Sequence, residues 1–253
     1  MNSLSLSEIS EYIKSEIGPQ FHDKKIDKIN KITLNDIIKR KNPYLFRAKA
    51  NNDAHEFIKS VLDATVSSGE ETTFGNFLEN IAIFVNEQVY GGRKSASTGL
   101  DLEFEDGNKK YLISIKSGPN WGNAGQITNL KKNFNTAKRI LTTSGGSRNI
   151  NIICIEACCY GVDNAPDKGT HLKLCGQRFW ELISGGDENL FRDIITPLGH
   201  LGKERNDELD LISSKKLNIL TGAFIEKFCI SGVIDWDSLI RFNSGKNPFT
   251  PKA

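Results

Sequence analysis

The stretch that decides the fold is "GLDLEFEDGNKKYLISIKSGPNWGN", residues 99–123. Its first part, "LDLEFE", alternates apolar and acidic residues, and "EDGN" is a turn sequence. The following "KYLISIK" alternates again and ends in Lys116, before a loop of Gly, Pro, Trp and Asn. Alternation with a period of two on both sides of a turn predicts an antiparallel β-hairpin.

The alternation also assigns side chains to the two faces of this hairpin, since residues two apart on a strand share a face. Asp101, Glu103 and Glu105 therefore share one face of the first strand. Ser114 and Lys116 share one face of the second. If the turn sets the two faces side by side, the lysine lies near the carboxylates at the open end of the hairpin.

The residues on both sides of the hairpin predict helices and further strands. A helix is expected over 72–91, where Thr72 or Thr73 can cap its start. The near-continuous apolar run 150–161 predicts a strand that is buried on both faces. Further predicted elements are helices at 33–41, 53–68, 122–143 and 204–229 and a strand at 171–176. This order predicts an α/β fold of the α+β kind, with a central mixed β-sheet flanked by helices and an N-terminal helical region.

The composition limits the class of protein. The chain has 253 residues, a net charge of +2 and 38% hydrophobic residues, which predicts a soluble globular protein of one large domain or one domain with a helical appendage. The mild positive charge neither requires nor excludes a nucleic-acid partner. No apolar stretch suits a membrane span or a signal-peptide core. The five cysteines lack CxxC spacing, which favours reduced thiols in a cytoplasmic protein.

Carboxylates gathered beside a lysine are typical of divalent-metal phosphodiester hydrolysis. Carboxylate oxygens suit Mg²⁺, and the metal polarises the phosphate and lowers the pKa of a bound water. A neighbouring lysine orients that water and stabilises the charge of the transition state. The spacing alone leaves an alternative open, because a half-exposed strand with a lysine at its end shows the same pattern.

The hairpin and three further blocks resemble a known nuclease family. An Asp on one strand followed by acid-x-Lys on the next resembles the core of the PD-(D/E)XK nucleases. Together, "TFGNFLENI", the hairpin, "AGQITNLKKNF" and "GQRFWELISGG" are similar to type II restriction endonucleases that cut short GG…CC-type sites. The resemblance covers roughly residues 72–187 and implies a catalytic core at 71–200, between helices at 1–70 and C-terminal helices at 201–253 packed on the core.

The resemblance also implies roles for single residues. Asp101 matches the metal-binding aspartate of the family, and Lys116 matches its lysine. Glu79, on the helix before the hairpin, matches the acid that touches the metal or its waters. Gln126 matches a residue that supports the lysine or contacts phosphate. The implied cofactor is Mg²⁺, with Mn²⁺ as a substitute.

The sequence departs from the family pattern at Ser114, which stands where an acid is expected two residues before the lysine. A hydroxyl is a poorer Mg²⁺ ligand than a carboxylate. Either Ser114 contributes through a water, or Glu79 or Glu103 supplies the missing charge. Glu103 lies about 7 Å further along the strand than Asp101, so we favour Glu79.

Contacts with DNA are predicted for polar and basic residues near the hairpin. Asn120 and Asn123, in the loop after Lys116, are candidates for phosphate binding, although a rigid turn with Trp121 as a packing residue is an equal alternative. The other candidates are Arg93, Lys94, Gln126, Asn164 and Lys168. The lysines between Lys24 and Lys41 fit either phosphate contacts or an ordinary solvated helix surface, and the second interpretation is favoured.

These inferences predict a type II restriction endonuclease. It is expected to cut double-stranded DNA at a short palindromic site and to leave 5′-phosphate and 3′-hydroxyl ends. A twofold site favours a homodimer, with residues 1–70 as the candidate dimerisation arm, and a cognate DNA methyltransferase as a functional partner. The alternatives are a PD-(D/E)XK repair or structure-selective nuclease, a non-catalytic DNA-binding relative with a degenerate site, and a soluble metabolic α/β enzyme.

Overall fold

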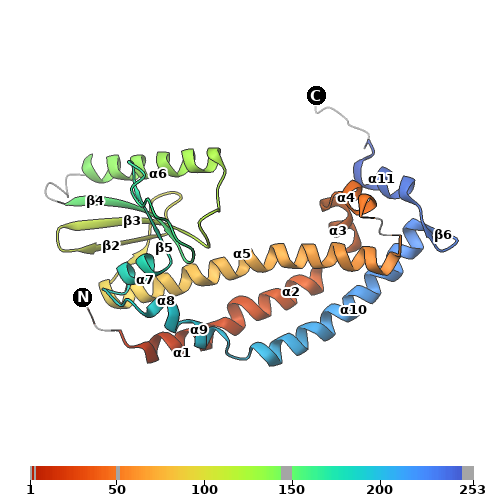
Figure 1. Ribbon diagram of the computed structural model, residues 1–253, viewed down its shortest axis with the longest axis horizontal. Helices are drawn as coiled ribbons and strands as arrows, with labels where there is room; N and C mark the ends of the chain where they lie inside the picture. Colours follow the sequence, from red (N-terminus) through yellow and green to blue (C-terminus); the bar gives the residue numbers. More distant parts are fainter. Residues whose placement is uncertain (1, 3, 50–51, 144–149, 247–253) are drawn as a thin grey trace. The chain divides into compact units, whose positions relative to one another are not determined.

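A computed structural model describes residues 2, 4–49, 52–143 and 150–246 (Figure 1). The chain forms two compact units. The first, called here the sheet unit, comprises residues 1–18 and 74–200. The second, called here the helical unit, comprises residues 19–73 and 201–253. The boundaries between the two units differ from those of the three ranges predicted from the sequence, which are 1–70, 71–200 and 201–253.

The sheet unit contains a five-stranded mixed sheet in the order β1-β2-β3-β4-β5. Its strands are β1 Arg93–Lys94, β2 Leu102–Asp106, β3 Lys109–Lys116, β4 Asn151–Cys158 and β5 Leu172–Cys175. Strands β1, β2 and β3 pair antiparallel, whereas β3, β4 and β5 pair parallel. The predicted mixed sheet is therefore confirmed.

The predicted hairpin is formed by β2 and β3, and its register pairs Leu102 with Ile113 and Asp106 with Lys109. Gly107 takes a φ of +58° in the turn, a conformation that favours glycine. In β4, every residue from Cys154 to Cys158 is buried, which confirms the strand predicted from the apolar run.

Helices cover both faces of the sheet. Helix α6, Ala124–Thr143, packs Leu130, Phe134 and Ala137 against Leu112 of β3 and Cys154 of β4. The alternate face carries Phe104, whose ring lies 4.7 Å from that of Tyr90 at the end of α5. Figure 1 shows α6 and the C-terminal part of α5 on opposite sides of the strands. The remaining helices of the unit are α1 Leu6–Ile17, α7 Gln177–Ile183, α8 Leu190–Asp193 and α9 Ile195–Leu198.

The helical unit is built around a core of aromatic and branched side chains. Phe57, Phe224 and Phe228 lie at its centre and are almost fully buried. Its elements are α2 Asp23–Lys31, α3 Leu34–Arg40, α4 Pro43–Ala48, α10 Gly202–Phe228, α11 Trp236–Ser244 and the short strands β6 Cys229–Ile230 and β7 Val233–Ile234. A π-helical turn, η1 Gly18–His22, begins at the last residue of the first segment of the sheet unit and continues into the helical unit. Thr33 caps α3 and is capped in return by Asp36.

One helix prediction is wrong. The sequence predicts separate helices at 53–68 and 72–91, but the structure has one helix, α5 Ala54–Tyr90, of 37 residues. Thr72 and Thr73 do not cap a helix, because their hydroxyls bond the carbonyls of Ser68 and Gly69 in the preceding turn. The side chain of Lys28 fills the space beside Gly69. A single glycine costs a helix only about 1 kcal/mol, so packing of this kind is enough to keep the helix continuous.

None of the described helices combines the length and the apolar character that crossing a membrane requires.

Candidate active site

Asp101 lies just before β2, and hairpin pairing holds it opposite Ser114. Its backbone N–H donates to the carbonyl of Ile113 at 2.8 Å. Its carboxylate atom Oδ2 accepts from the Ser114 hydroxyl at 3.2 Å and from the Ile115 N–H at 2.6 Å. The predicted arrangement of an acid face beside the Ser114 and Lys116 face is therefore confirmed, and the carboxylate is held rigidly.

Lys116 ends β3 and completes this cluster. Its Nζ lies 3.6 Å from Oδ2 of Asp101 and donates to the carbonyl of Ile115 at 2.9 Å. The ammonium also lies 5.1 Å from the ring centroid of Trp121, within the range of a cation–π contact. About a quarter of each partner's side chain is exposed, at 26% for Lys116 and 23% for Asp101, so a substrate can reach both.

Glu79 comes to the same place from α5. Burial raises the pKa of its carboxyl, and the negative charge of Asp101 raises it further. The positive charges of Lys94 and Lys116 act in the opposite direction. Burial likewise raises the pKa of Cys159 to about 12, with a contribution from Glu79. Glu79 therefore lies in the electrostatic field of the Asp101–Lys116 pair.

Glu103 has a different environment from Glu79. Its carboxylate accepts from Arg93 Nε at 2.8 Å and from the Ser95 hydroxyl at 3.2 Å. Its side chain is 8% exposed, against 73% for Arg93. Glu103 thus serves as the buried ion-pair partner of Arg93 in β1, which weighs against a second role as a metal ligand.

The donor set near Lys116 fits a hard cation. Oδ1 of Asp101 and the carboxylate of Glu79 make no hydrogen bond within the described part of the chain. The two acids repel each other, which a divalent cation would relieve. The described residues contain no group of three or more His, Cys, Asp or Glu side chains placed to hold a metal. Two carboxylates are enough for Mg²⁺, which usually keeps several waters and takes further oxygens from phosphate.

The predicted DNA contacts occupy varied positions. Asn123 and Gln126 cap the start of α6 reciprocally, through bonds of 3.0 and 2.9 Å. Asn120 is exposed in the loop after β3, and Lys94 is exposed and close enough to Glu79 to lower its pKa. Arg93 pairs with Glu103, Lys168 pairs with Asp163 at 3.0 Å, and Asn164 is exposed. Lys94 is thus the DNA-contact candidate with a direct electrostatic link to the acids.

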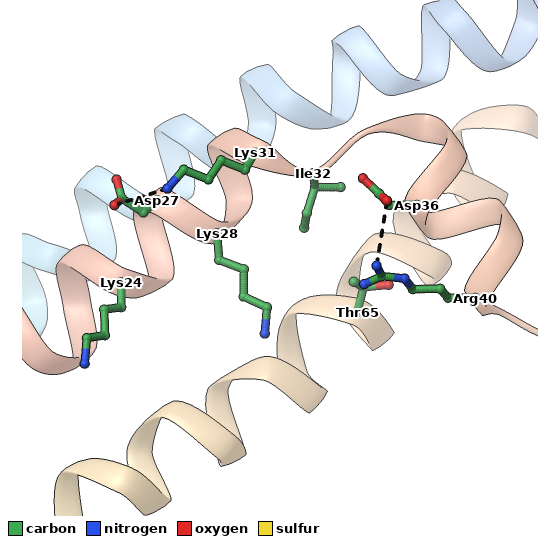
Figure 2. Close-up of a pocket in the computed structure, with 8 residues that line it drawn as sticks. All are labelled: Lys24, Asp27, Lys28, Lys31, Ile32, Asp36, Arg40 and Thr65. Carbon is green, nitrogen blue, oxygen red and sulfur yellow. Dashed lines mark ion pairs between the residues drawn. The ribbon is translucent and has the colours of Figure 1, made fainter.

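The basic segment at Lys24–Lys41 lines a pocket of about 440 Å³ in the helical unit. Figure 2 shows Lys24, Lys28, Lys31 and Arg40 around it, together with two aspartates. Lys31 lies 3.8 Å from Asp27, and Arg40 lies 3.9 Å from Asp36. These pairs are largely exposed and neutralise part of the positive charge, as on an ordinary solvated helix surface.

A second cluster of polar side chains surrounds Glu156 of β4, which the sequence does not single out as functional. Glu156 pairs with Ser114 in the parallel register of β3 and β4. It accepts from Trp121 Nε1 at 2.9 Å and Lys173 Nζ at 2.8 Å, and lies 3.1 Å from His171 Nε2. Burial alone would raise the pKa of Glu156, but the hydrogen bonds outweigh it and hold the pKa at about 2. An acid within an apolar strand is the signal that could have marked this residue.

A comparison with protein-family models identifies the family to which the chain belongs. The model described as type II restriction endonuclease EcoO109I matches residues 7–206 of the 253, a range that includes Glu79, Asp101, Ser114 and Lys116. A search of curated proteins found no match to the chain. Since the matched range covers far more than half of the sequence, the chain belongs to the EcoO109I family of type II restriction endonucleases.

Proposed function

We propose that this chain is a Mg²⁺-dependent type II restriction endonuclease that cuts both strands of DNA at a short palindromic site. The observation that carries the proposal is the Asp101–Lys116 pair, held at 3.6 Å by the hairpin, with Glu79 in its field. Membership of a restriction endonuclease family supports DNA as the substrate. The proposed products carry 5′-phosphate and 3′-hydroxyl ends.

Asp101 and Glu79 are the proposed metal-binding residues, directly or through water. When bound, Mg²⁺ supplies polarisation of the scissile phosphate and a lower pKa for a coordinated water. Among the described residues, the contacts of the Asp101 carboxylate go to Oδ2, which leaves Oδ1 for a cation. Mn²⁺, which accepts the same oxygen ligands, is expected to substitute.

Lys116 is the proposed residue that positions the attacking water. Its ammonium has three donors, of which one is used on the carbonyl of Ile115. Another donor can hold a water on the open side of the cluster, and the positive charge offsets the charge that develops on the phosphate. Ser114 acts indirectly, because its hydroxyl orients the Asp101 carboxylate.

The proposed assembly follows from the symmetry of the substrate. A palindromic site has twofold symmetry, which a homodimer matches with one cluster for each strand. The N-terminal helices within residues 1–70 remain the candidate dimerisation arm. A cytoplasmic location and a methyltransferase that protects the same site complete the proposal.

Cleavage of phage DNA tests this function directly. Wild-type protein with Mg²⁺ is expected to give discrete fragments, and Lys116→Ala is expected to lower the cleavage rate at least 100-fold. Lys109→Ala is the matched control, since Lys109 lies exposed at the other end of the same strand. The proposal fails if wild-type protein binds DNA but never cuts it with Mg²⁺ or Mn²⁺. That result would favour a non-catalytic relative, as the serine at position 114 suggests.

Sequencing of the fragment ends separates the proposed function from its nearest rival. Ends that all lie at one short palindrome support a restriction endonuclease. Ends that depend on junctions or flaps rather than on sequence would indicate a repair or structure-selective nuclease.

A further inference from the structure

Among the described residues, Glu156 itself forms no hydrogen bond or ion pair with Asp101 or Lys116. The side chains of His171 and Glu156 are only 1% and 3% exposed. Within the described part of the chain, the hydrogen-bond partners of the Glu156 carboxylate are three nitrogen atoms: Trp121 Nε1 and Lys173 Nζ, which donate to it, and His171 Nε2, which donates in the tautomer that carries a proton there. A carboxylate saturated and buried in this way is not open to a metal, although it lies beside Ser114.

The indole of Trp121 links this cluster to the lysine. Its N–H donates to Oε1 of Glu156, and its ring lies beside the Lys116 ammonium at 5.1 Å. One edge of the indole is therefore held by the buried carboxylate while the Lys116 ammonium lies over its ring. The contacts form a chain from Glu156 through Trp121 to Lys116.

The loop that carries Trp121, residues 117–123, is anchored at a second point by the same cluster. Lys173, which pairs with Glu156, also donates to the carbonyl of Pro119 at 2.9 Å. The loop is thus held by Lys173 at the Pro119 carbonyl and by Glu156 at the indole N–H.

We propose that Glu156 is a positioning residue for DNA cleavage, acting through the Trp121 indole to hold the Lys116 ammonium in place. The inference rests on the proposed function of Lys116. A lysine has a long stem with many rotamers, and among the described residues the polar contacts of the Lys116 ammonium are the Ile115 carbonyl on its own strand and Asp101 across the hairpin at 3.6 Å. Displacement of a reacting group by about 1 Å can lower a rate roughly 100-fold.

Two variants test this role in the full-length protein. Trp121→Phe keeps an aromatic ring but removes the indole N–H, and Glu156→Gln removes the charge with little change of shape. Each is expected to lower kcat about 10- to 100-fold while KM for DNA changes less than about twofold. Trp236→Phe is the matched control, since Trp236 is also half-buried and also carries a cation, Arg47, at 5.2 Å from its ring. It is expected to leave kcat unchanged.

The double variant tests whether the two residues act in series. If Glu156 acts through the indole, Glu156→Gln added to Trp121→Phe lowers kcat little further. The hydrogen bond itself has a readout that does not need cleavage. The chain has three tryptophans, so ¹⁵N labelling gives three indole N–H signals. Glu156→Gln is expected to shift the Trp121 signal and to leave that of Trp180, which donates to the Cys159 carbonyl, in place.

The outcomes separate this inference from the proposed function. Wild-type protein that never cuts DNA overturns the function, and the positioning role with it. Wild-type protein that cuts, with variants that keep its kcat, overturns the positioning role alone. A rise in KM that accounts for the whole loss, or independent effects in the double variant, also overturns it, because Trp121 would then be a DNA contact or the two residues would act separately.

Discussion

Glu79 is the residue on which the proposed metal chemistry depends most, because Ser114 supplies no carboxylate. Burial raises the pKa of Glu79, the charge of Asp101 raises it further, and Lys94 and Lys116 lower it. The ionised form that binds a cation therefore accumulates only as the pH rises through this raised value. The effects of Asp101 and Lys116 on its pKa are the evidence that Glu79 lies near the hairpin.

Substitution of Asp101 and substitution of Lys116 are expected to shift the pKa of Glu79 in opposite directions. In metal-free protein, Asp101→Asn lowers the pKa of Glu79, because a repelling negative charge is lost. Lys116→Met raises it, because an attracting positive charge is lost. Carboxyl ¹³C NMR titration measures both shifts. Lys109→Met is the control, and it is expected to leave the pKa of Glu79 unchanged. Unchanged titration in both variants would mean that Glu79 lies outside the cluster.

Cleavage by Glu79→Gln and Glu103→Gln is expected to differ sharply. Glu79→Gln should lower kcat/KM at least 100-fold and leave DNA binding intact, because it removes a proposed metal ligand. Glu103→Gln should still cut, since its carboxylate is committed to Arg93 and Ser95. It should instead lower the free energy of unfolding by about 1–3 kcal/mol, as expected when a buried charged hydrogen bond is lost. The reverse pattern would assign the metal to Glu103.

Strand alternation is enough to predict part of this cluster but not all of it. Asp101, Ser114 and Lys116 are close in sequence, and a two-residue period with a turn fixes their common face. Glu156 is different, because its partners come from segments on either side of β4. Trp121 lies in the loop after β3, whereas His171 and Lys173 lie at the start of β5, and only the parallel order β3-β4-β5 brings them together. No local pattern in the sequence encodes that strand order.

At the scale of elements, α5 shows how tertiary contacts override local signals. The sequence predicts one helix at 53–68 and another capped by Thr72 or Thr73, yet a single helix continues through this region. The Glu70 side chain pairs with Lys25 of α2, and Lys28 of the same helix fills the space beside Gly69. A break would forfeit these contacts, so the helix tolerates the glycine.

Two helix glycines are expected to respond differently to alanine. A Cβ at Gly222 of α10 would meet nothing within 4 Å, so Gly222→Ala should raise the free energy of unfolding by about 0.5–1 kcal/mol. Gly69→Ala should gain less, because the Lys28 side chain must first move away. Urea unfolding of the two variants and wild type measures the difference. A Gly69→Ala gain equal to that of Gly222→Ala would show that Lys28 has no fixed place there.

At the scale of the whole molecule, the helical unit joins segments that are far apart in sequence. Lys216 of α10 donates to the carbonyl of Asn30 at 2.7 Å, and Asn243 of α11 donates to the carbonyl of Ile38 at 2.6 Å. A prediction from local periodicity identifies these helices but not their partners, because nothing in a helix pattern specifies contacts across about 200 residues of chain. The predicted three-range division therefore differs from the observed two units.

Acid unfolding of the whole protein is expected to depend on Glu156. Its pKa of about 2 in the folded protein lies below the value of roughly 4.3 for an unfolded chain, so its ionisation stabilises the fold above pH 4.3. A tenfold difference in proton affinity corresponds to ~1.4 kcal/mol, so the contribution at neutral pH is on the order of 3 kcal/mol. It should shrink as the pH falls from about 5 towards 2, because the unfolded chain binds the proton first.

Comparison with Glu156→Gln isolates this contribution, since glutamine does not titrate. Chemical unfolding at pH 7, 5, 4 and 3.5 should show wild type more stable than the variant at the two higher values, with the gap narrowing at the two lower ones. Other carboxylates titrate in both proteins and cancel in the difference. A gap that stays constant from pH 7 to 3.5 would contradict an ionised Glu156 held by Trp121, His171 and Lys173, because it would mean that the carboxyl has the same pKa in the folded and the unfolded protein. A wild type that loses stability relative to the variant as the pH rises would mean that the carboxyl is buried in its neutral form.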